Sequence, residues 1–175
     1  MQVIFMKNYS KALKTYLITG FIFTAILGTL AHFFYEWCGE NPLVGLFSPV
    51  NESTWEHMKL LFFPVVLWSL FIPDGLAEQK PGLRPALLLG GITGTLSIPV
   101  LFYTYSGILG RTVTGIDISI FFISVTIAFL CAYHITDAES VQKKRTAVLF
   151  LTVLFLIAFS LFTFFPPDIG LFADP

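Results

Sequence analysis

Two glutamates and a histidine gather in one short stretch of the sequence, directly before an apolar segment. The stretch 51–59 contains Glu52, Glu56 and His57, and the apolar segment 60–68 follows it. Ionisable side chains are costly next to hydrocarbon, so at the mouth of a membrane helix they indicate a functional site. Carboxylates and imidazoles can act as general acid and base, as metal ligands or as proton relays. The stretch predicts a site and leaves its chemistry open.

A second pair of such residues, His32 and Glu36, lies near the end of the first apolar segment. Both this pair and Glu52/Glu56 have i,i+4 spacing, which places each pair on one helix face. Two glutamates in a partly dry site repel each other unless they share a proton or a cation. We therefore predict His32, Glu36, Glu56 and His57 as candidate ligands of a divalent metal, and Glu52, Glu56 and His57 as candidate catalytic residues.

The other residues of the stretch are assigned to the same site, although each also has a structural interpretation. Asn51, Trp55 and Lys59 flank the acids. Ser53 and Glu56 have the spacing of a capping box, and Glu56 and Lys59 could form an i,i+3 surface pair. Neither an H-E-x-x-H nor a G-x-S-x-G motif occurs in the sequence, which lowers the weight of an enzymatic interpretation.

The composition indicates that lipid is the main solvent of the chain. Only 12% of its 175 residues are charged and 55% are hydrophobic, whereas soluble domains carry about a quarter charged residues. The net charge of −1 gives no reason to expect a nucleic-acid partner. Cys38 and Cys131 are isolated, so they form neither a zinc motif nor a redox pair. The partners to expect are the lipid bilayer and either a second copy of the chain or another membrane subunit.

The apolar segments predict an all-α fold, a single transmembrane domain over 1–175 built as a bundle of five transmembrane helices. These helices are expected at about 15–37, 52–72, 86–105, 117–136 and 147–165. The connection 38–51 is apolar but too short to span, so we expect a cap that is either interfacial or re-entrant. Gly90 and Gly94 predict a face where helices approach closely.

The basic residues predict the orientation of the bundle in a plasma or inner membrane. Eight lie on the side of the N-terminus, and they are Lys7, Lys11, Lys14, Lys80, Arg84, Lys143, Lys144 and Arg145. Only Lys59 and Arg111 lie on the other side. The positive-inside rule then places the N-terminus in the cytoplasm and the C-terminus outside. His32, Glu36, Glu52 and Glu56 would share the outer level, together with Asp117 and Asp168.

Two motifs resemble those of an uncharacterised family of small multi-pass prokaryotic membrane proteins. The first is Asn-Glu-Ser-x-Trp-Glu-His, which starts at Asn51, and the second is the ending Pro166-Pro167 with Leu171-Phe172-x-Asp-Pro. The resemblance implies a shared site around the first motif and brings no activity, substrate or cofactor with it.

Three classes of function are compatible with these sequence features. The leading one is a Glu/His site at the outer membrane face that binds or acts on a small or lipid-like molecule, either with or without a metal. The second is a proton- or cation-coupled transporter or channel component, for which the inverted repeats typical of transporters are not detectable. The third is an accessory subunit of a membrane complex, packed on its partner through the glycine face.

Overall fold

The regular structure is helical throughout the part of the chain that the computed structural model describes, which is residues 2–174, with side chains from residue 11 onward. The side chain of Lys7 and the whole of Pro175 lie outside this part. The elements are α1 (Gln2–Trp37), α2 (Pro42–Gly45), α3 (Thr54–Trp68), α4 (Asp74–Gln79), α5 (Leu83–Leu109), α6 (Thr114–Ile135), α7 (Glu139–Lys143), α8 (Arg145–Phe164) and the 3-10 turn η1 (Gly170–Phe172).

Four helices are long and apolar enough to cross a membrane, namely the Lys11–Trp37 part of α1 together with α5, α6 and α8. The expected fifth one, 52–72, is shorter than predicted, because α3 has only 15 residues. At 1.5 Å per residue it measures about 22 Å, less than the roughly 30 Å of a hydrocarbon core. Ser53 caps its start, and the chain leaves the helix after Trp68, before Pro73, which disfavours helix at the residue preceding it.

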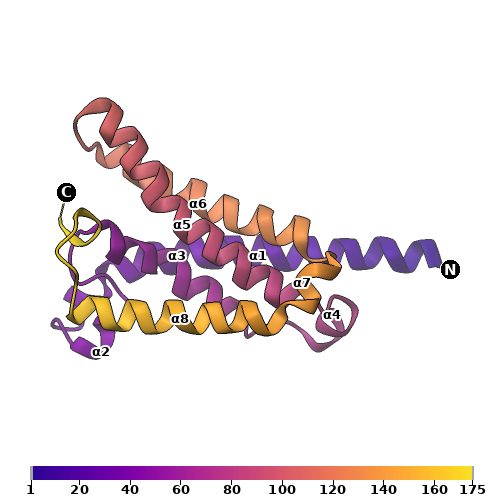
Figure 1. The fold of residues 1–175 in the computed structure, drawn as a ribbon. Coiled ribbons are helices and arrows are strands. Elements are labelled where there is room, and N and C mark those ends of the chain that lie inside the picture. Colours follow the sequence, from indigo (N-terminus) through magenta and orange to yellow (C-terminus); the bar gives the residue numbers. More distant parts are fainter. Residues whose placement is uncertain (1, 175) are drawn as a thin grey trace.

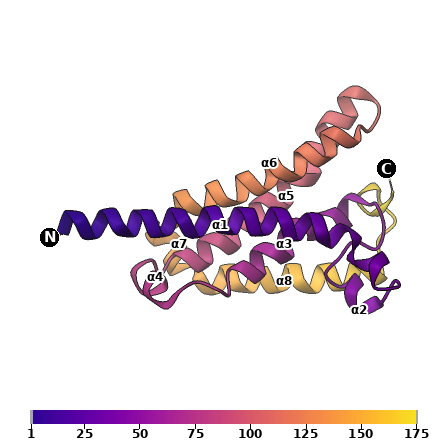
Figure 2. The ribbon, with the colours of Figure 1, turned by 180° about the vertical axis from the view of Figure 1, so that it is seen from behind.

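The helices form an elongated bundle with two distinct ends. Figures 1 and 2 show α2 and the C-terminus at one end, called here the α2 end, and α4 and α7 at the other, called the α4 end. The short helix α3 packs against α1 and α5, and most of its residues are buried. In contrast, α1, α5, α6 and α8 carry many exposed large apolar side chains, as lipid-facing helices do.

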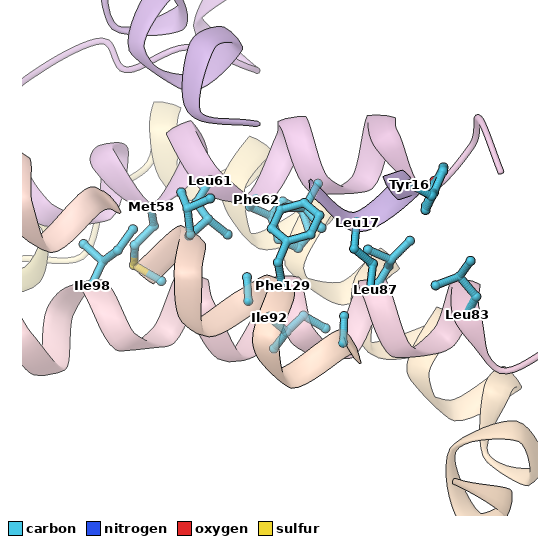
Figure 3. Close-up of a cluster of buried hydrophobic side chains, with 14 of the residues drawn as sticks. Tyr16, Leu17, Met58, Leu61, Phe62, Leu83, Leu87, Ile92, Ile98 and Phe129 are labelled. Carbon is cyan, nitrogen blue, oxygen red and sulfur yellow. The ribbon is translucent and has the colours of Figure 1, made fainter. Parts of the chain in front are cut away.

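The core is apolar and continuous along the middle of the bundle. Figure 3 shows side chains of α1, α3, α5 and α6 interlocking there, among them Leu17, Leu61, Leu87 and Phe129. Phe62 stacks on Phe155 and lies close to Phe159, which joins α8 to the same core. Because this core is made by side chains far apart in the sequence, it holds the helices in one arrangement.

Glycines allow two close helix contacts that matter for the site. A Cβ at Gly94 would lie 2.6 Å from the carbonyl oxygen of Ser124, and one at Gly90 would collide with that of Ala128. The prediction that these two glycines face another helix is confirmed, and the helix is α6 of the same chain. Gly28 of α1 lies in the same way against the carbonyl oxygen of Leu60 in α3.

The α5–α6 hairpin diverges from the rest of the bundle at the α2 end, as both views show. Pro99 lies in the diverging half of α5, where it removes a backbone hydrogen bond and favours a bend. A cavity lies at this end of the bundle, and residues of α1, α3, α5 and α6 line it.

Candidate functional site

A cavity of about 690 Å³ lies at the α2 end, between α1, α3, α5, α6 and the C-terminal segment. The polar residues that line it are Thr29, His32, Glu52, Thr54, His57, Thr112, Thr114, Asp117 and Asp174. The apolar residues are Phe33, Leu60, Ile98, Phe102, Ile118, Ile120, Phe121 and Phe122. One cavity thus combines a polar region with an apolar wall, which is the composition of a ligand site.

His32, Glu52 and His57 form a compact triad at the polar side of this cavity. The Nε2 atoms of His32 and His57 are 3.3 Å apart. Oε2 of Glu52 lies 3.4 Å from Nε2 of His57 and 3.8 Å from Nε2 of His32. One possible ligand atom from each of the three residues therefore lies within 4.8 Å of the other two, which is close enough for the three to share one metal ion.

The start of α3 orients the His57 ring within the triad. Nδ1 of His57 lies 2.9 Å from the carbonyl oxygen of Ser53. A carbonyl oxygen can only accept, so Nδ1 carries the proton, and in the neutral ring Nε2 keeps its lone pair. Asn51 supports this turn, because its Oδ1 accepts a hydrogen bond from the Ser53 backbone N–H at 3.0 Å. Nε2 of His57 is consequently held toward His32 and Glu52.

The close approach of α1 to α3 brings His32 into the same place. Gly28 lies one helical turn before His32, and the carbonyl oxygen it contacts belongs to Leu60, three residues after His57. Phe121 of α6 also lies against Gly28 and closes the cavity on that side. Without a side chain at position 28 the two helices can approach, and the two imidazoles meet.

The triad remains open on the cavity side. The side chains of His32 and His57 are 34% and 29% exposed, and that of Glu52 is 64% exposed. A molecule in the cavity can reach all three donor atoms, which a packed structural cluster would not permit.

Glu56, in contrast, points away from the triad into a fully enclosed ion pair. Nζ of Lys59 donates to Oε2 of Glu56 at 2.6 Å and to the carbonyl oxygens of Gly45 and Ser48 at 2.8 and 3.4 Å. The side chains of Lys59 and Glu56 are only 0% and 2% exposed. The pair thereby ties α3 to the segment around α2.

The same carboxylate also binds two other parts of the chain. Its Oε2 accepts from the Val50 backbone N–H at 3.0 Å, and its Oε1 accepts from the Thr163 hydroxyl of α8 at 2.9 Å. Only half of the expected capping box forms: Ser53 Oγ accepts from the Glu56 backbone N–H at 3.4 Å, while the Glu56 side chain is committed to Lys59. With all its oxygens engaged, Glu56 is positioned to hold the fold together.

The remaining predicted residues fall into two groups. Glu36 is exposed on α1 and lies outside the cavity lining, as does the exposed Asp168. Trp55 is buried and packs on Phe159 and Phe172, so it anchors the C-terminal segment. The structure thus brings His32 and His57 together with Glu52 and leaves Glu36 and Glu56 apart from them.

Two carboxylates that line the cavity, Asp117 and Asp174, were not among the predicted site residues, although the sequence placed Asp117 at the same level. Asp117 accepts a hydrogen bond from the Tyr105 hydroxyl, and that hydroxyl in turn accepts from the Val113 backbone N–H at 3.1 Å. Asp174 joins the lining through the C-terminal segment, which Tyr103 holds by donating to the carbonyl oxygen of Gly170 at 2.8 Å. A single carboxylate in the C-terminal segment carries no signal by itself, because its location depends on how the segment folds back.

Comparison with known proteins agrees with the prediction of an uncharacterised family. A family model described as a family of unknown function (DUF6512) matches residues 5–175. The chain belongs to this family. No curated protein and no solved structure matches the chain. Membership of the family is thus shown over almost the whole chain, and the family brings no activity with it.

Proposed function

We propose that this DUF6512 protein is an integral membrane protein that binds an amphiphilic molecule in the cavity at the α2 end, with the polar head of that molecule against the His32–Glu52–His57 triad. The observation that carries the proposal is the cavity itself, which joins an ionisable triad to an apolar wall among helices fit to cross a membrane. A purely polar solute would make no apolar contacts with this wall, whereas an acyl chain can pack against it.

The apolar wall is continuous with the surface that faces lipid. Phe33 of α1 and Ile118 and Phe122 of α6 line the cavity, yet they are 43%, 56% and 42% exposed. They belong to α1 and α6, and Figure 2 shows α6 diverging from α1 toward the α2 end. An acyl chain can therefore enter sideways from the bilayer between α1 and α6, without first leaving the membrane.

Charge in the cavity favours a head group without negative charge. Among the described residues that line it, Glu52, Asp117 and Asp174 are acidic and none is lysine or arginine. An anionic head group such as a phosphate would be repelled by these carboxylates, because like charges that share a poorly hydrated site cost free energy. A neutral or amino head group is instead complementary to them.

The α2 end would face the outside of the cell. Lys80, Arg84 and the basic run 143–145 belong to the α4 end, where α4 and α7 lie, whereas Arg111 belongs to the tip of the α5–α6 hairpin near the α2 end. The positive-inside rule then supports a cytoplasmic α4 end. A reporter fused to the C-terminus should be active only outside, and activity in the cytoplasm would contradict this orientation.

A binding measurement tests the proposed ligand class. The protein is placed in lipid nanodiscs and titrated with a spin-labelled long-chain alkylamine and with an alkyl phosphate of equal chain length. We expect saturable binding of the amine and at least about tenfold weaker binding of the phosphate, about 1.4 kcal/mol or more. Equal binding of both, or preference for the phosphate, would contradict the proposal.

Two matched variants of α1 locate the binding. Thr29 lines the cavity and Thr19 does not, yet both are exposed and both donate to the carbonyl oxygen four residues earlier. Thr29→Trp should fill the cavity and weaken alkylamine binding at least tenfold, while Thr19→Trp should leave it unchanged. The same loss in both variants would show that the amine binds the lipid-facing surface and not the cavity.

The apolar packing beyond the cavity supports a binding pocket that ends inside the bundle over a conduction path. From Leu60 and Ile98 toward the α4 end, the interior is filled by apolar side chains such as Leu61, Phe62 and Leu87 (Figure 3). The glycine face, which supported the accessory-subunit interpretation, is already covered by α6. Neither rival function gains an observation of its own.

A further inference from the structure

We propose that His32, Glu52 and His57 form a zinc-binding site of the open type, with three protein ligands and a fourth position that faces the cavity. This inference goes beyond amphiphile binding and does not depend on it. It also differs from the ligand set predicted from the sequence, because Glu52 replaces Glu36 and Glu56. Zinc and an amino head group would compete for the same three residues, so the alkylamine titration described above is made on protein freed of metal.

Two of the three distances within the triad match those of one tetrahedral zinc ion, and the third is slightly longer. With zinc–ligand bonds of about 2.0–2.1 Å, neighbouring donor atoms of a tetrahedral site lie about 3.3–3.4 Å apart. The three separations here are 3.3, 3.4 and 3.8 Å. A triangle with these sides has a circumradius of about 2.0 Å, so an ion bonded to all three atoms would lie close to their plane, and a tetrahedral site requires the 3.8 Å separation between His32 and Glu52 to shorten by about 0.4 Å.

The hydrogen bonding of His57 is that of a metal ligand. Metal-binding histidines usually donate their other ring N–H to a carbonyl or carboxylate oxygen, which sets the tautomer and the direction of the lone pair. His57 does so through Nδ1 and the carbonyl oxygen of Ser53. The lone pair on Nε2 then meets a second imidazole nitrogen and a carboxylate oxygen, both of which can bind a cation.

The ligand types favour zinc over the common hard cations. Two imidazoles and one carboxylate are borderline donors that suit zinc, whereas magnesium and calcium prefer oxygen ligands alone. Zinc sites with three protein ligands of the His₂Glu type keep the fourth position for water or substrate. Here that position opens to the cavity, since all three ligands line it.

A proton is the competing occupant of the same centre. A protonated His57 would donate through Nε2 to Glu52, and the two histidines would form a simple hydrogen-bonded pair. That arrangement needs no metal, so only a direct metal measurement separates the two.

The test uses the full-length protein with an affinity tag that contains no histidine. After purification in detergent and treatment with a chelator, zinc is added back, excess is removed, and metal per chain is measured by mass spectrometry. We expect one tightly held zinc per chain. Substitution with Co²⁺ should give the intense visible absorption of a four-coordinate site, because cobalt reports ligand geometry where zinc is silent.

Matched variants identify the ligands. Glu52→Gln, at an exposed position that should not disturb folding, should lower zinc affinity at least about tenfold, and His57→Gln should do the same. Glu36→Gln, one turn from His32 on the same helix, should leave affinity unchanged. Zinc at well under one per chain in the wild type, or an octahedral cobalt spectrum, would overturn the inference. Equal affinity in the wild type and Glu52→Gln would overturn it as well.

Discussion

Two groups of ionisable residues lie within eight positions of each other in the sequence, yet their surroundings differ completely. Glu56 and Lys59 are enclosed, and every oxygen of the carboxylate and every proton of the ammonium group has a partner within the chain. Glu52 and His57, with His32, are partly exposed and direct their donor atoms at a shared centre beside a cavity. A fully satisfied group has no remaining capacity for a ligand, so the comparison supports a structural role for the first group and our proposal of ligand binding for the second.

The largest expected effect comes from removing Lys59. Lys59→Met should lower the free energy of unfolding in detergent by about 3–5 kcal/mol, because it leaves the Glu56 carboxylate buried without its counter-charge. Thermal unfolding monitored by circular dichroism measures this. Adding Glu56→Gln to Lys59→Met removes the stranded charge and should recover part of the loss. If the double variant is no more stable than Lys59→Met, the two residues are not energetically coupled and the structural assignment is wrong.

A second variant should destabilise the bundle at a place away from both groups, and it gives a reference for the stability loss of Lys59→Met. Gly94→Leu should cost about 1–3 kcal/mol, because its side chain would collide with the backbone of α6 at Ser124. Gly107→Leu in the same helix has open space around it and should change stability little. Equal unfolding temperatures for the two variants would show that α5 and α6 are not in close contact at Gly94.

Gly28 offers a way to disturb the triad while leaving the ion pair in place. Gly28→Ala adds a methyl group between α1 and the carbonyl oxygen of Leu60, so α1 must move outward and take His32 with it. We expect zinc affinity to fall at least about tenfold for a stability loss of about 1 kcal/mol. The reverse pattern, unchanged zinc affinity with a large loss of stability, would mean that the approach of these helices does not position His32.

The smallest effect on stability is expected for Glu52→Gln. Its side chain is 64% exposed, and exposed substitutions usually change stability by no more than about 0.5 kcal/mol. Measured beside Lys59→Met in the same unfolding assay, it gives the sharpest contrast between the two groups. A loss comparable with that of Lys59→Met would mean that Glu52 also serves the fold.

Local patterns predicted much of the fold, and the exceptions have a common cause. The apolar segments located the long helices to within a few residues, except at the start of the first, and the glycines of α5 correctly indicated a close contact. The segment 52–72 has the hydropathy of a spanning helix, but hydropathy does not distinguish lipid from protein surroundings. In the structure it is the short, buried α3, and its apolar side chains face the other helices.

The site shows the same limit. The i,i+4 spacing predicted that Glu52 and Glu56 share one helix face, and this is wrong, because Glu52 precedes α3 and only Glu56 lies within it. Helical spacing therefore could not say that the two carboxylates point in different directions. Tertiary packing brings Lys59 to Glu56 and His32 to Glu52, and these different partners distinguish the two carboxylates.

The sequence by itself determined that this chain is helical, has helices apolar enough to cross a membrane, and carries ionisable residues at the ends of apolar segments, because hydropathy and charge are properties of each residue and its neighbours. Only the tertiary structure decided which of these residues meet. His32 and His57 come together across 25 positions because Gly28 lets α1 approach α3, and a contact between two helix backbones depends on residues that local sequence patterns do not connect.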